Sequence, residues 1–164
     1  MRIVVVSDTH GDFFRLKAIV DKHLKDAGLL IHLGDGNREL EDIQTLYPQL
    51  RCLGVRGNCD QNSDAPCTLL TEAGGKTILA THGHLYGVKG GLDRLKQAAR
   101  QNHAHIVLYG HTHQNFTGYE EGLHIMNPGS LSKPRNYMPS YGIIDITEGG
   151  ILTNVVEGKR FVRH

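Results

Sequence analysis

The chain has 164 residues, of which 39% are hydrophobic and 21% charged, and its formal net charge is +1. A chain of this length forms one domain with a substantial core, so we predict a single domain over residues 1–164. The balanced charge gives no nucleic-acid track, and no apolar run is long enough for a signal peptide or a membrane span. Three cysteines are an odd and sparse set, which favours a reducing compartment and a cytoplasmic protein.

Short β-branched runs alternate with helical patterns over the first two-thirds of the sequence. A strand is expected at residues 4–6, followed by apolar residues at helical spacing from Leu16 to Ala27, with Asp12 as a candidate N-cap. A second strand at 29–31 precedes a second helix at 40–47. Further strands are expected at 52–55, 77–80 and 106–109, with a helix at 92–99 before the last. This alternation indicates an α/β fold with parallel pairing.

The last third of the sequence has a different pattern. Strands are expected at residues 123–126, 142–146 and 151–156, and Glu148-Gly149-Gly150 is a good hairpin connector. Strands joined by tight turns are typical of antiparallel hairpins, so this pattern predicts a second, more antiparallel sheet beside a mixed sheet, with the helices outside.

Polar residues of metal-ligand type follow five of the expected strands. Each such motif is weak alone, because a lone Gly-Asp is usually a turn and an Asp at a strand end is often a helix cap. Together they are informative, since binding sites in α/β sheets form outside the carboxyl ends of the strands. A packed core would not gather so many uncompensated polar groups. The segments are Ser7-Asp8-Thr9-His10, Gly34-Asp35, Arg56-Gly57-Asn58, Thr81-His82-Gly83-His84 and Gly110-His111-Thr112-His113.

The types of side chain in these segments constrain the ion. Oxygen and imidazole ligands without thiolates favour manganese, iron, zinc, nickel or cobalt over copper(I) or calcium. About seven ligands are too many for one ion and fit two divalent ions about 3.5–4 Å apart, a geometry that suits displacement at phosphorus. We expect manganese, with the other four metals as alternatives.

The order and spacing of these motifs resemble the calcineurin-like metallophosphoesterase superfamily. The short chain resembles its small bacterial and archaeal phosphodiesterases, and this resemblance implies a sandwich of two mixed β-sheets flanked by helices. It also implies a phosphodiesterase that acts on a small phosphate ester. The motifs that carry the resemblance are Asp8-x-His10, Gly34-Asp35, Gly57-Asn58-Cys59-Asp60, His82, Gly110-His111-Thr112-His113 and Asn127-Pro128-Gly129-Ser130.

The resemblance also implies a role for each motif residue. Asp35 would bridge two metal ions, and a hydroxide between the ions would attack phosphorus in line. Nearby groups would neutralise charge on the phosphoryl oxygens. The first ion would be held by Asp8, His10, Asp35 and His113, and the second by Asp35, Asn58, His82 and His111.

One position departs from the family pattern. Cys59 stands where many members have a histidine that protonates the leaving group, and a thiol with a reference pKa near 8.5 is a poor substitute. His84 is a candidate for this role; the alternative is that it orients a ligand through a hydrogen bond. Arg56 is a candidate to hold a phosphate oxygen, with a surface ion pair as the alternative. Residues 84–91, which include Lys89, form either a rim over the site or a plain connector.

Two other functions remain open at this point. The same fold resembles a retromer subunit that serves as a protein-binding scaffold, but such a scaffold predicts an eroded ligand set, whereas every ligand position is filled here. A metal-dependent nuclease is the second alternative, although no basic or aromatic track supports it. The sequence leaves the physiological substrate, the native metal and the oligomeric state undetermined.

Overall fold

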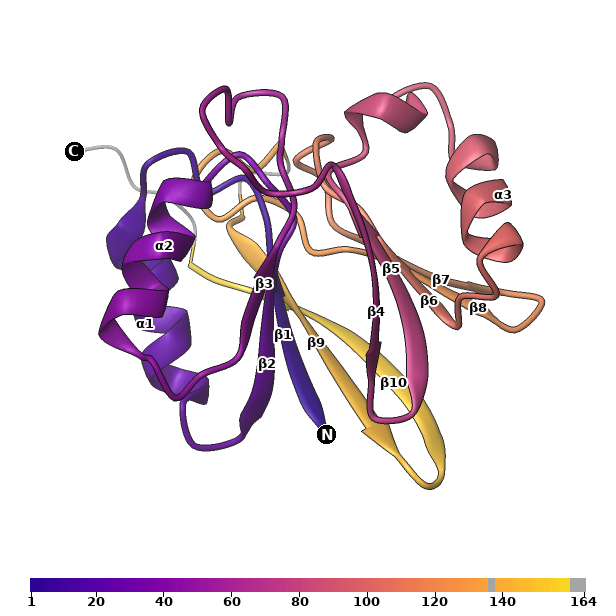
Figure 1. Cartoon of the computed structure of the whole chain (residues 1–164), viewed down its shortest axis with the longest axis horizontal. Coiled ribbons are helices and arrows are strands. Elements are labelled where there is room, and N and C mark those ends of the chain that lie inside the picture. The colour runs from indigo at the N-terminus through magenta and orange to yellow at the C-terminus, as the bar shows by residue number, and fades with distance from the viewer. Residues whose placement is uncertain (136–137, 160–164) are drawn as a thin grey trace.

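The structure is a computed structural model that describes residues 1–135 and 138–159. Two β-sheets of five strands each face one another, and helices cover their outer faces (Figure 1). The predicted fold class, an α/β sandwich of two mixed sheets flanked by helices, is confirmed.

The first sheet has the strand order β10-β9-β1-β2-β3. Strands β1, β2 and β3 run parallel, whereas β9 is antiparallel to both β1 and β10. The hairpin connector predicted between the last two strands is confirmed, because Thr147 pairs with Gly150 across Glu148 and Gly149. The strands are β1 (Arg2–Val6), β2 (Ala27–His32), β3 (Cys52–Gly54), β9 (Ser140–Thr147) and β10 (Gly150–Glu157).

The second sheet has the order β4-β5-β6-β8-β7, with β5, β6 and β8 parallel and an antiparallel strand at each edge. The edge strands β4 and β7 are absent from the sequence prediction. In β7 the residues Phe116 and Tyr119 are exposed, so this strand lacks the buried apolar run by which the other strands are recognised. The strands are β4 (Thr68–Ala73), β5 (Lys76–Thr81), β6 (Ile106–Leu108), β7 (Phe116–Glu120) and β8 (Leu123–Asn127).

Helices α1 (Phe13–His23) and α2 (Asn37–Leu46) cover the first sheet, and α3 (Asp93–Gln101) covers the second (Figure 1). The predicted N-cap is confirmed, because the Asp12 side chain accepts a hydrogen bond from Arg15 N at 3.2 Å. The first helix is shorter than its apolar spacing predicts. Ala27 begins β2 instead of extending the helix, because it pairs with Arg2 of β1, so tertiary pairing overrides the helical pattern.

Alternate residues of β1 enter two different cores. Ile3 and Val5 face the layer between the two sheets, whereas Val4 and Val6 pack beneath α1 and α2. A strand that is buried on both faces can place polar groups only at its ends. Strand β1 therefore delivers its functional residues at its carboxyl end, beginning with Ser7.

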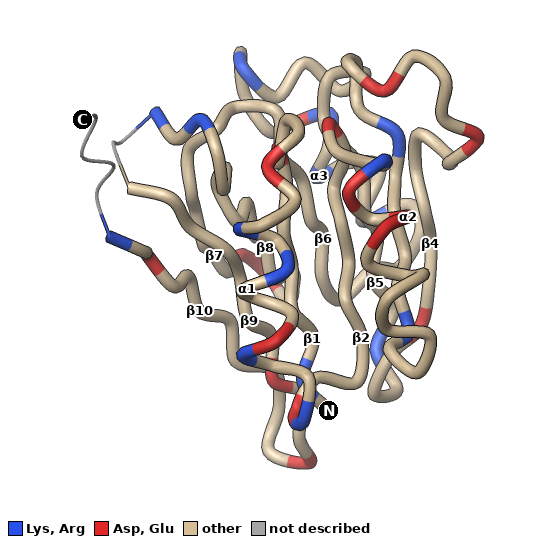
Figure 2. Tube along the Cα trace, turned by 90° about the vertical axis from the view of Figure 1, so that its left-hand side faces the viewer, with Lys and Arg blue, Asp and Glu red and all other residues tan. Residues whose placement is uncertain are grey.

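The loops that follow β1, β2, β3, β5 and β6 gather at the upper end of the molecule in Figure 1, and the β4–β5 and β9–β10 turns lie at the lower end. Lys and Arg residues are interspersed with Asp and Glu along the trace (Figure 2). None of the helices in the described residues is both long and apolar enough to span a bilayer.

Candidate metal centre

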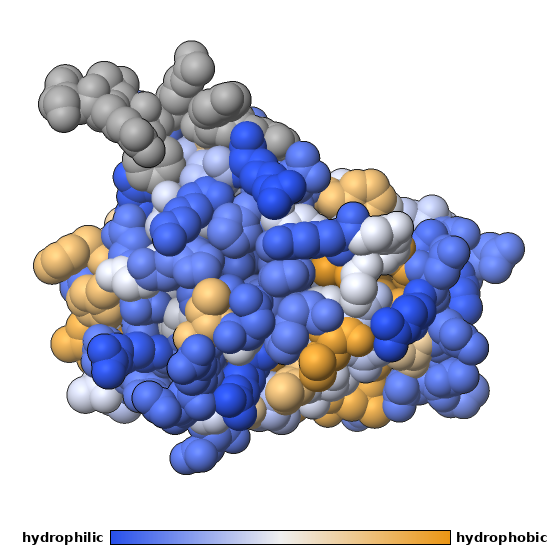
Figure 3. Space-filling model, turned by 90° about the horizontal axis from the view of Figure 1, so that it is seen from above, coloured by the Kyte–Doolittle hydropathy of each residue, from blue (hydrophilic) through white to orange (hydrophobic). Residues whose placement is uncertain are grey.

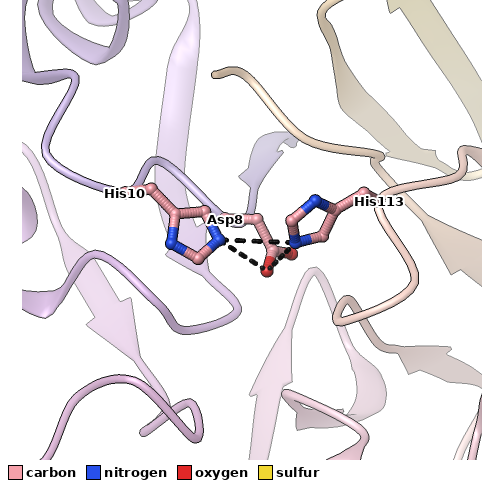
Figure 4. A group of neighbouring side chains, drawn as sticks. All are labelled: Asp8, His10 and His113. Carbon is pink, nitrogen blue, oxygen red and sulfur yellow. Dashed lines mark hydrogen bonds and ion pairs between the residues drawn. The ribbon is translucent and has the colours of Figure 1, made fainter. Parts of the chain in front are cut away.

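Asp8 lies at the centre of the loop cluster, directly after β1. Its side chain is fully buried, and Oδ1 lies 3.1 Å from His113 Nε2 and 3.5 Å from His10 Nε2 (Figure 4). In the described part of the chain this oxygen accepts no hydrogen bond. A buried carboxylate oxygen that faces two imidazole nitrogens is a typical cation ligand.

The rest of Asp8 is held in place by short hydrogen bonds. Oδ2 accepts from Ser7 Oγ at 2.6 Å and from the His111 backbone N–H at 3.1 Å. The Asp8 carbonyl accepts from Ser130 Oγ at 2.8 Å and from Ser132 Oγ at 3.1 Å. The motif at residues 127–130 thus reaches the site through Ser130.

Asp35, which follows β2, presents the second buried carboxylate. Its Oδ2 lies 3.3 Å from His82 Nε2 and 3.8 Å from His10 Nε2, while Oδ1 accepts from the Cys59 backbone N–H at 2.8 Å. Asp8 Oδ1 is 3.9 Å from His82 Nε2. Each of the two carboxylates therefore faces both His10 and His82.

Backbone carbonyls orient two of the histidines. His82 Nδ1 donates to Leu33 O at 2.7 Å, and His113 Nδ1 donates to Lys133 O at 2.8 Å. With the proton on Nδ1, each ring directs the lone pair of Nε2 toward the carboxylates. This is the arrangement that a metal-binding histidine requires. His82 Nε2 is buried and has no hydrogen-bond partner among the described residues.

Among the described residues, three overlapping groups could each hold a cation, because the ligand atoms within each group lie within 4.8 Å of one another. Asp8 belongs to two of the groups, and so does Asp35. The donors are carboxylates and imidazoles, together with one exposed thiol, which fits divalent transition metals. The groups are Asp8–His10–His113, Asp8–Asp35–His82 and His10–Asp35–Cys59.

Two of the predicted ligands lie close to these groups but outside them. The His111 ring is 5.0 Å from the His82 ring, centroid to centroid. Asn58 is exposed, and its Nδ2 donates to Cys59 Sγ at 3.5 Å. The structure thus brings together Asp8, His10, Asp35, His82 and His113, and leaves the roles of His111 and Asn58 as predictions.

Charge pairing shifts the pKa values within the cluster. Burial would raise the pKa of Asp8, but the facing His10 and His113 rings hold it well below its usual range. Asp8 in turn raises the pKa of His113, and the Asp35 carboxylate raises that of His82 despite burial. Burial and the charge on His82 lower the pKa of His111 to about 4. Positive charge is therefore favoured where the two carboxylates converge, which is also where a cation would bind.

Of the candidate proton donors, His84 lies beside His82 and Cys59 lies beside Asp35. The His84 ring is 5.4 Å from the His82 ring and 6.1 Å from that of His111, and burial lowers its pKa. Its Nδ1 is buried without a hydrogen-bond partner in the described chain. The Cys59 thiol is exposed, and desolvation together with the Asp35 charge raises its pKa. Arg56 donates from Nη2 to Gln61 O at 3.0 Å, and both roles considered for it stay predictions.

Asp60 supports the site in a way that sequence reasoning missed. Its carboxylate accepts four backbone N–H bonds, from Asp35 at 2.7 Å, Gly57 at 2.9 Å, Gly36 at 3.0 Å and Asn37 at 3.2 Å. It thereby joins the loop after β3 to the loop after β2 and to the amino end of α2. The sequence feature that pointed to Asp60 was its position as the last residue of the motif at residues 57–60.

A buried hydrogen-bond chain under the site was also missed. Gly34 N–H donates to His32 Nδ1 at 3.1 Å, and His32 Nε2 donates to Thr9 Oγ1 at 3.0 Å. Thr9 Oγ1 then donates to Glu39 Oε2 at 2.8 Å. Burial lowers the pKa of His32 to about 4, so this ring is neutral. The sequence feature that pointed to this series of hydrogen bonds was a histidine, His32, at the end of an apolar strand.

Clefts formed by the described residues lie beside the loops that carry the cluster. One of 600 Å³ is lined by His10, Asp35, Cys59 and Lys133 among others. A second of 380 Å³ is lined by residues that include Thr112 and Arg135. Figure 3 shows the end of the molecule that carries the loops as largely hydrophilic, with apolar patches between the polar side chains.

Comparisons with known proteins agree with this geometry. The sequence model of the calcineurin-like phosphoesterase superfamily domain matches residues 1–149. The chain is 34% identical to the probable metallophosphoesterase YsnB of Bacillus subtilis, over 89% of this chain and 85% of that protein. It is also 34% identical to the phosphodiesterase YfcE of Escherichia coli K12, over 88% of each chain.

Two solved structures share the fold. A predicted phosphoesterase from Streptococcus pneumoniae superposes with a TM-score of 0.83 at 30% identity, covering 95% of this chain and 88% of that one. Vps29 from Entamoeba histolytica in complex with Zn²⁺ superposes with a TM-score of 0.72 at 20% identity, covering 96% of this chain and 99% of that one. The second likeness extends to the fold alone.

Proposed function

Because the chain belongs to the calcineurin-like phosphoesterase superfamily and is a hydrolase of phosphate esters, we propose that it is a phosphodiesterase with a binuclear metal centre. One observation supports two ions above all. Asp35 belongs to one candidate cation group with His10 and to another with His82, so its carboxylate can serve two ions. Two adjacent cations that share a carboxylate suit displacement at phosphorus.

We propose the following distribution of ligands. Asp35 is the bridge, because its Oδ2 lies within 4 Å of both His10 Nε2 and His82 Nε2, which we assign to different ions. His111 and Asn58 complete the second ion from the loops after β6 and β3. The first ion takes Asp8, His10, Asp35 and His113, and the second takes Asp35, Asn58, His82 and His111.

When bound, two divalent ions supply an activated water and neutralise charge on the phosphoryl oxygens. The chain supplies the orientation of every ligand and a positive flank for the substrate. Arg56 lies close enough to His84 for its charge to lower the pKa of that ring. We assign Arg56 to a phosphoryl oxygen and His84 to the leaving group. A scaffold role gains no specific support from a site that retains its full set of ligand-type residues.

Metal titration and turnover together test the proposal. Chelated protein reconstituted with manganese should contain two ions per chain by elemental analysis, and it should hydrolyse bis(p-nitrophenyl) phosphate. The metal-free protein should be inactive and should recover on adding Mn²⁺. A firm stoichiometry of one ion in active protein would overturn the binuclear centre, and absence of turnover with any of the five expected metals would overturn the phosphodiesterase.

The proton donor is decided by two variants and two substrates. A general acid contributes about 10²–10⁴-fold, chiefly when the leaving group is a strong base. If His84 is the donor, His84→Ala lowers turnover of an alkyl diester far more than that of an aryl diester, and Cys59→His changes little. If no side chain protonates the leaving group in the wild type, Cys59→His should raise turnover of the alkyl diester and leave that of the aryl diester nearly unchanged. An unchanged aryl-to-alkyl ratio in both variants rules out both side chains.

A further inference from the structure

The cleft of 380 Å³ is separate from the ligand atoms but shares a wall with them. Thr112, which lines it, stands between His111 and His113 in the sequence, and Asn127 Nδ2 donates to Thr112 Oγ1 at 2.9 Å. Arg135 also lines the cleft, and its backbone N–H donates to His113 O at 3.1 Å. A group bound in this cleft would therefore lie against the backbone that carries two of the candidate ligands.

The cleft combines a buried apolar floor with an exposed aromatic ring. Val88 and Tyr109 are each 5% exposed, whereas Phe116 on the edge strand β7 is 44% exposed. A volume of 380 Å³ lies within the range of small-molecule sites, and the surface that this cleft exposes is more polar than apolar. An exposed ring beside such a floor offers a stacking surface for a planar group.

The charged side chains that line this cleft are all positive. Lys89 and Arg135 line it, and no Asp or Glu among the described residues does. Within residues 1–135 and 138–159, neither cationic group forms a hydrogen bond or an ion pair. The larger cleft differs, because Glu39, Glu41 and Asp60 contribute to its lining. Unpaired cations beside an apolar floor favour an anion attached to an organic group.

We propose that this cleft binds one ester substituent of the substrate, which carries a planar ring placed against Phe116 and a second anionic group held by Lys89 and Arg135. The assignment rests on the proposed phosphodiesterase function, and it makes the substrate a nucleotide-like phosphodiester. The metal centre takes the reacting phosphate. The cleft takes the ring and the second charge, so it selects the substrate without taking part in the chemistry.

Three esters that release the same nitrophenolate test this substrate class. They are methyl p-nitrophenyl phosphate, the p-nitrophenyl ester of thymidine 5′-phosphate, and the 5′-p-nitrophenyl ester of thymidine 3′,5′-bisphosphate. They differ by a nucleoside and then by a second phosphate. With the manganese-loaded enzyme, kcat/KM should rise at each step, by about tenfold for the ring, as expected for stacking on an aromatic side chain.

Variants assign each step to its residue. Phe116→Ala should lower the kcat/KM ratio of the nucleoside ester to the methyl ester about tenfold, and Phe116→Tyr, which keeps the ring, should restore it. Lys89→Gln should remove most of the advantage of the second phosphate. Controls away from the cleft are Phe14→Ala, whose ring is 80% exposed on α1, and Lys25→Gln in the turn before β2. Neither control should change a ratio.

Equal kcat/KM for the three esters in the wild type would overturn the substrate class while leaving the phosphodiesterase intact. Ratios that Phe116→Ala and Lys89→Gln leave unchanged would overturn the assignment to this cleft. Absence of turnover of all three esters would instead count against the phosphodiesterase function itself.

Discussion

The two ends of the sandwich differ in which residue types adopt the left-handed backbone conformation. At the hairpin end, the left-handed conformation is taken mainly by glycines, as at Gly74, Gly75 and Gly122. At the metal-site end, residues with side chains adopt it alongside glycines such as Gly34 and Gly83, although the left-handed conformation costs most residues that have a side chain about 1–2 kcal/mol. These residues are Asp8 (φ 54°), His10 (φ 42°), Asp35 (φ 56°), His111 (φ 70°) and His113 (φ 59°).

The difference separates the demands of folding from those of the site. A hairpin turn needs only a permissive residue, so glycine satisfies it. The site needs a ligand atom where the chain turns sharply at the end of a strand, and only a side chain provides one. Strain and uncompensated polarity are thus concentrated where a cation would bind. Four predictions test this contrast, from the largest expected effect to the smallest.

The largest effect is expected at the bridging carboxylate. Asp35→Asn should lower turnover of bis(p-nitrophenyl) phosphate by about 10³-fold or more, equivalent to about 4 kcal/mol of barrier, because its loss disturbs both ions. Asp8→Asn should do less damage at saturating metal. Elemental analysis of both variants gives the metal content alongside the rates. Equal residual activity would count against Asp35 as the bridge, since Asp8 also faces His10 and His82.

The next effect concerns the anchor beneath the ligand loops. Asp60→Asn should lower the free energy of unfolding by about 3 kcal/mol, because an amide cannot replace a carboxylate that accepts four backbone N–H bonds. Metal affinity should fall with it, since Asp35 and Gly57 lose their common partner. Urea unfolding and metal titration measure the two effects. The exposed Asp64 in the same loop supplies the control Asp64→Asn, and similar losses in both variants would contradict the anchor.

The third effect is a pH dependence of the chelated protein. The pKa of His32 is lowered from 6.5 to about 4 in the folded state, so its stabilisation is complete above pH 6.5 and is lost as the pH falls toward 4. This loss amounts to about 3 kcal/mol. The pKa values of His82 and His113 are raised, so these residues contribute the opposite pH dependence: their stabilisation is present at low pH and is lost as the pH rises through their folded-state pKa values.

Urea unfolding of the wild type and of His32→Asn at pH 6.5 and 4.5 measures the His32 contribution. It equals the difference between the two proteins in how far the free energy of unfolding falls from pH 6.5 to pH 4.5. Parallel pH dependences of the two proteins would show that His32 titrates normally.

The smallest effects are expected in the hairpins. Gly75→Ala should lower the free energy of unfolding by about 1 kcal/mol, since φ is 76° there and the new methyl group meets no atom within 4 Å. Glu121→Gly, at φ 47°, should raise it by a similar or smaller amount. Turnover should not change in either variant. A change in kcat would show that the two ends are coupled.

Sequence patterning predicts the site better than its surroundings. The carboxyl ends of parallel strands converge by rule, so Asp8, Asp35 and His82 were expected to meet, and they do. The edge strand β7 was not predicted, because its exposed residues carry no burial pattern. Asp60 and His32 act through backbone groups and a buried hydrogen-bond chain, and such partners depend on how loops pack. Periodicity contains no information on that packing.

The serine contact to Asp8 has a consequence for how the protein is made. Ser130 holds the Asp8 carbonyl across 122 positions, and the His111 N–H reaches the Asp8 carboxylate across 103. Strand β1 also needs β9 as a neighbour, through Ile3 and Ile144. While the ribosome is still producing the first sheet, these partners do not yet exist. The ion-binding cluster therefore forms late in synthesis, and an unfinished chain presents single imidazoles and carboxylates that cannot retain an ion as the complete cluster does.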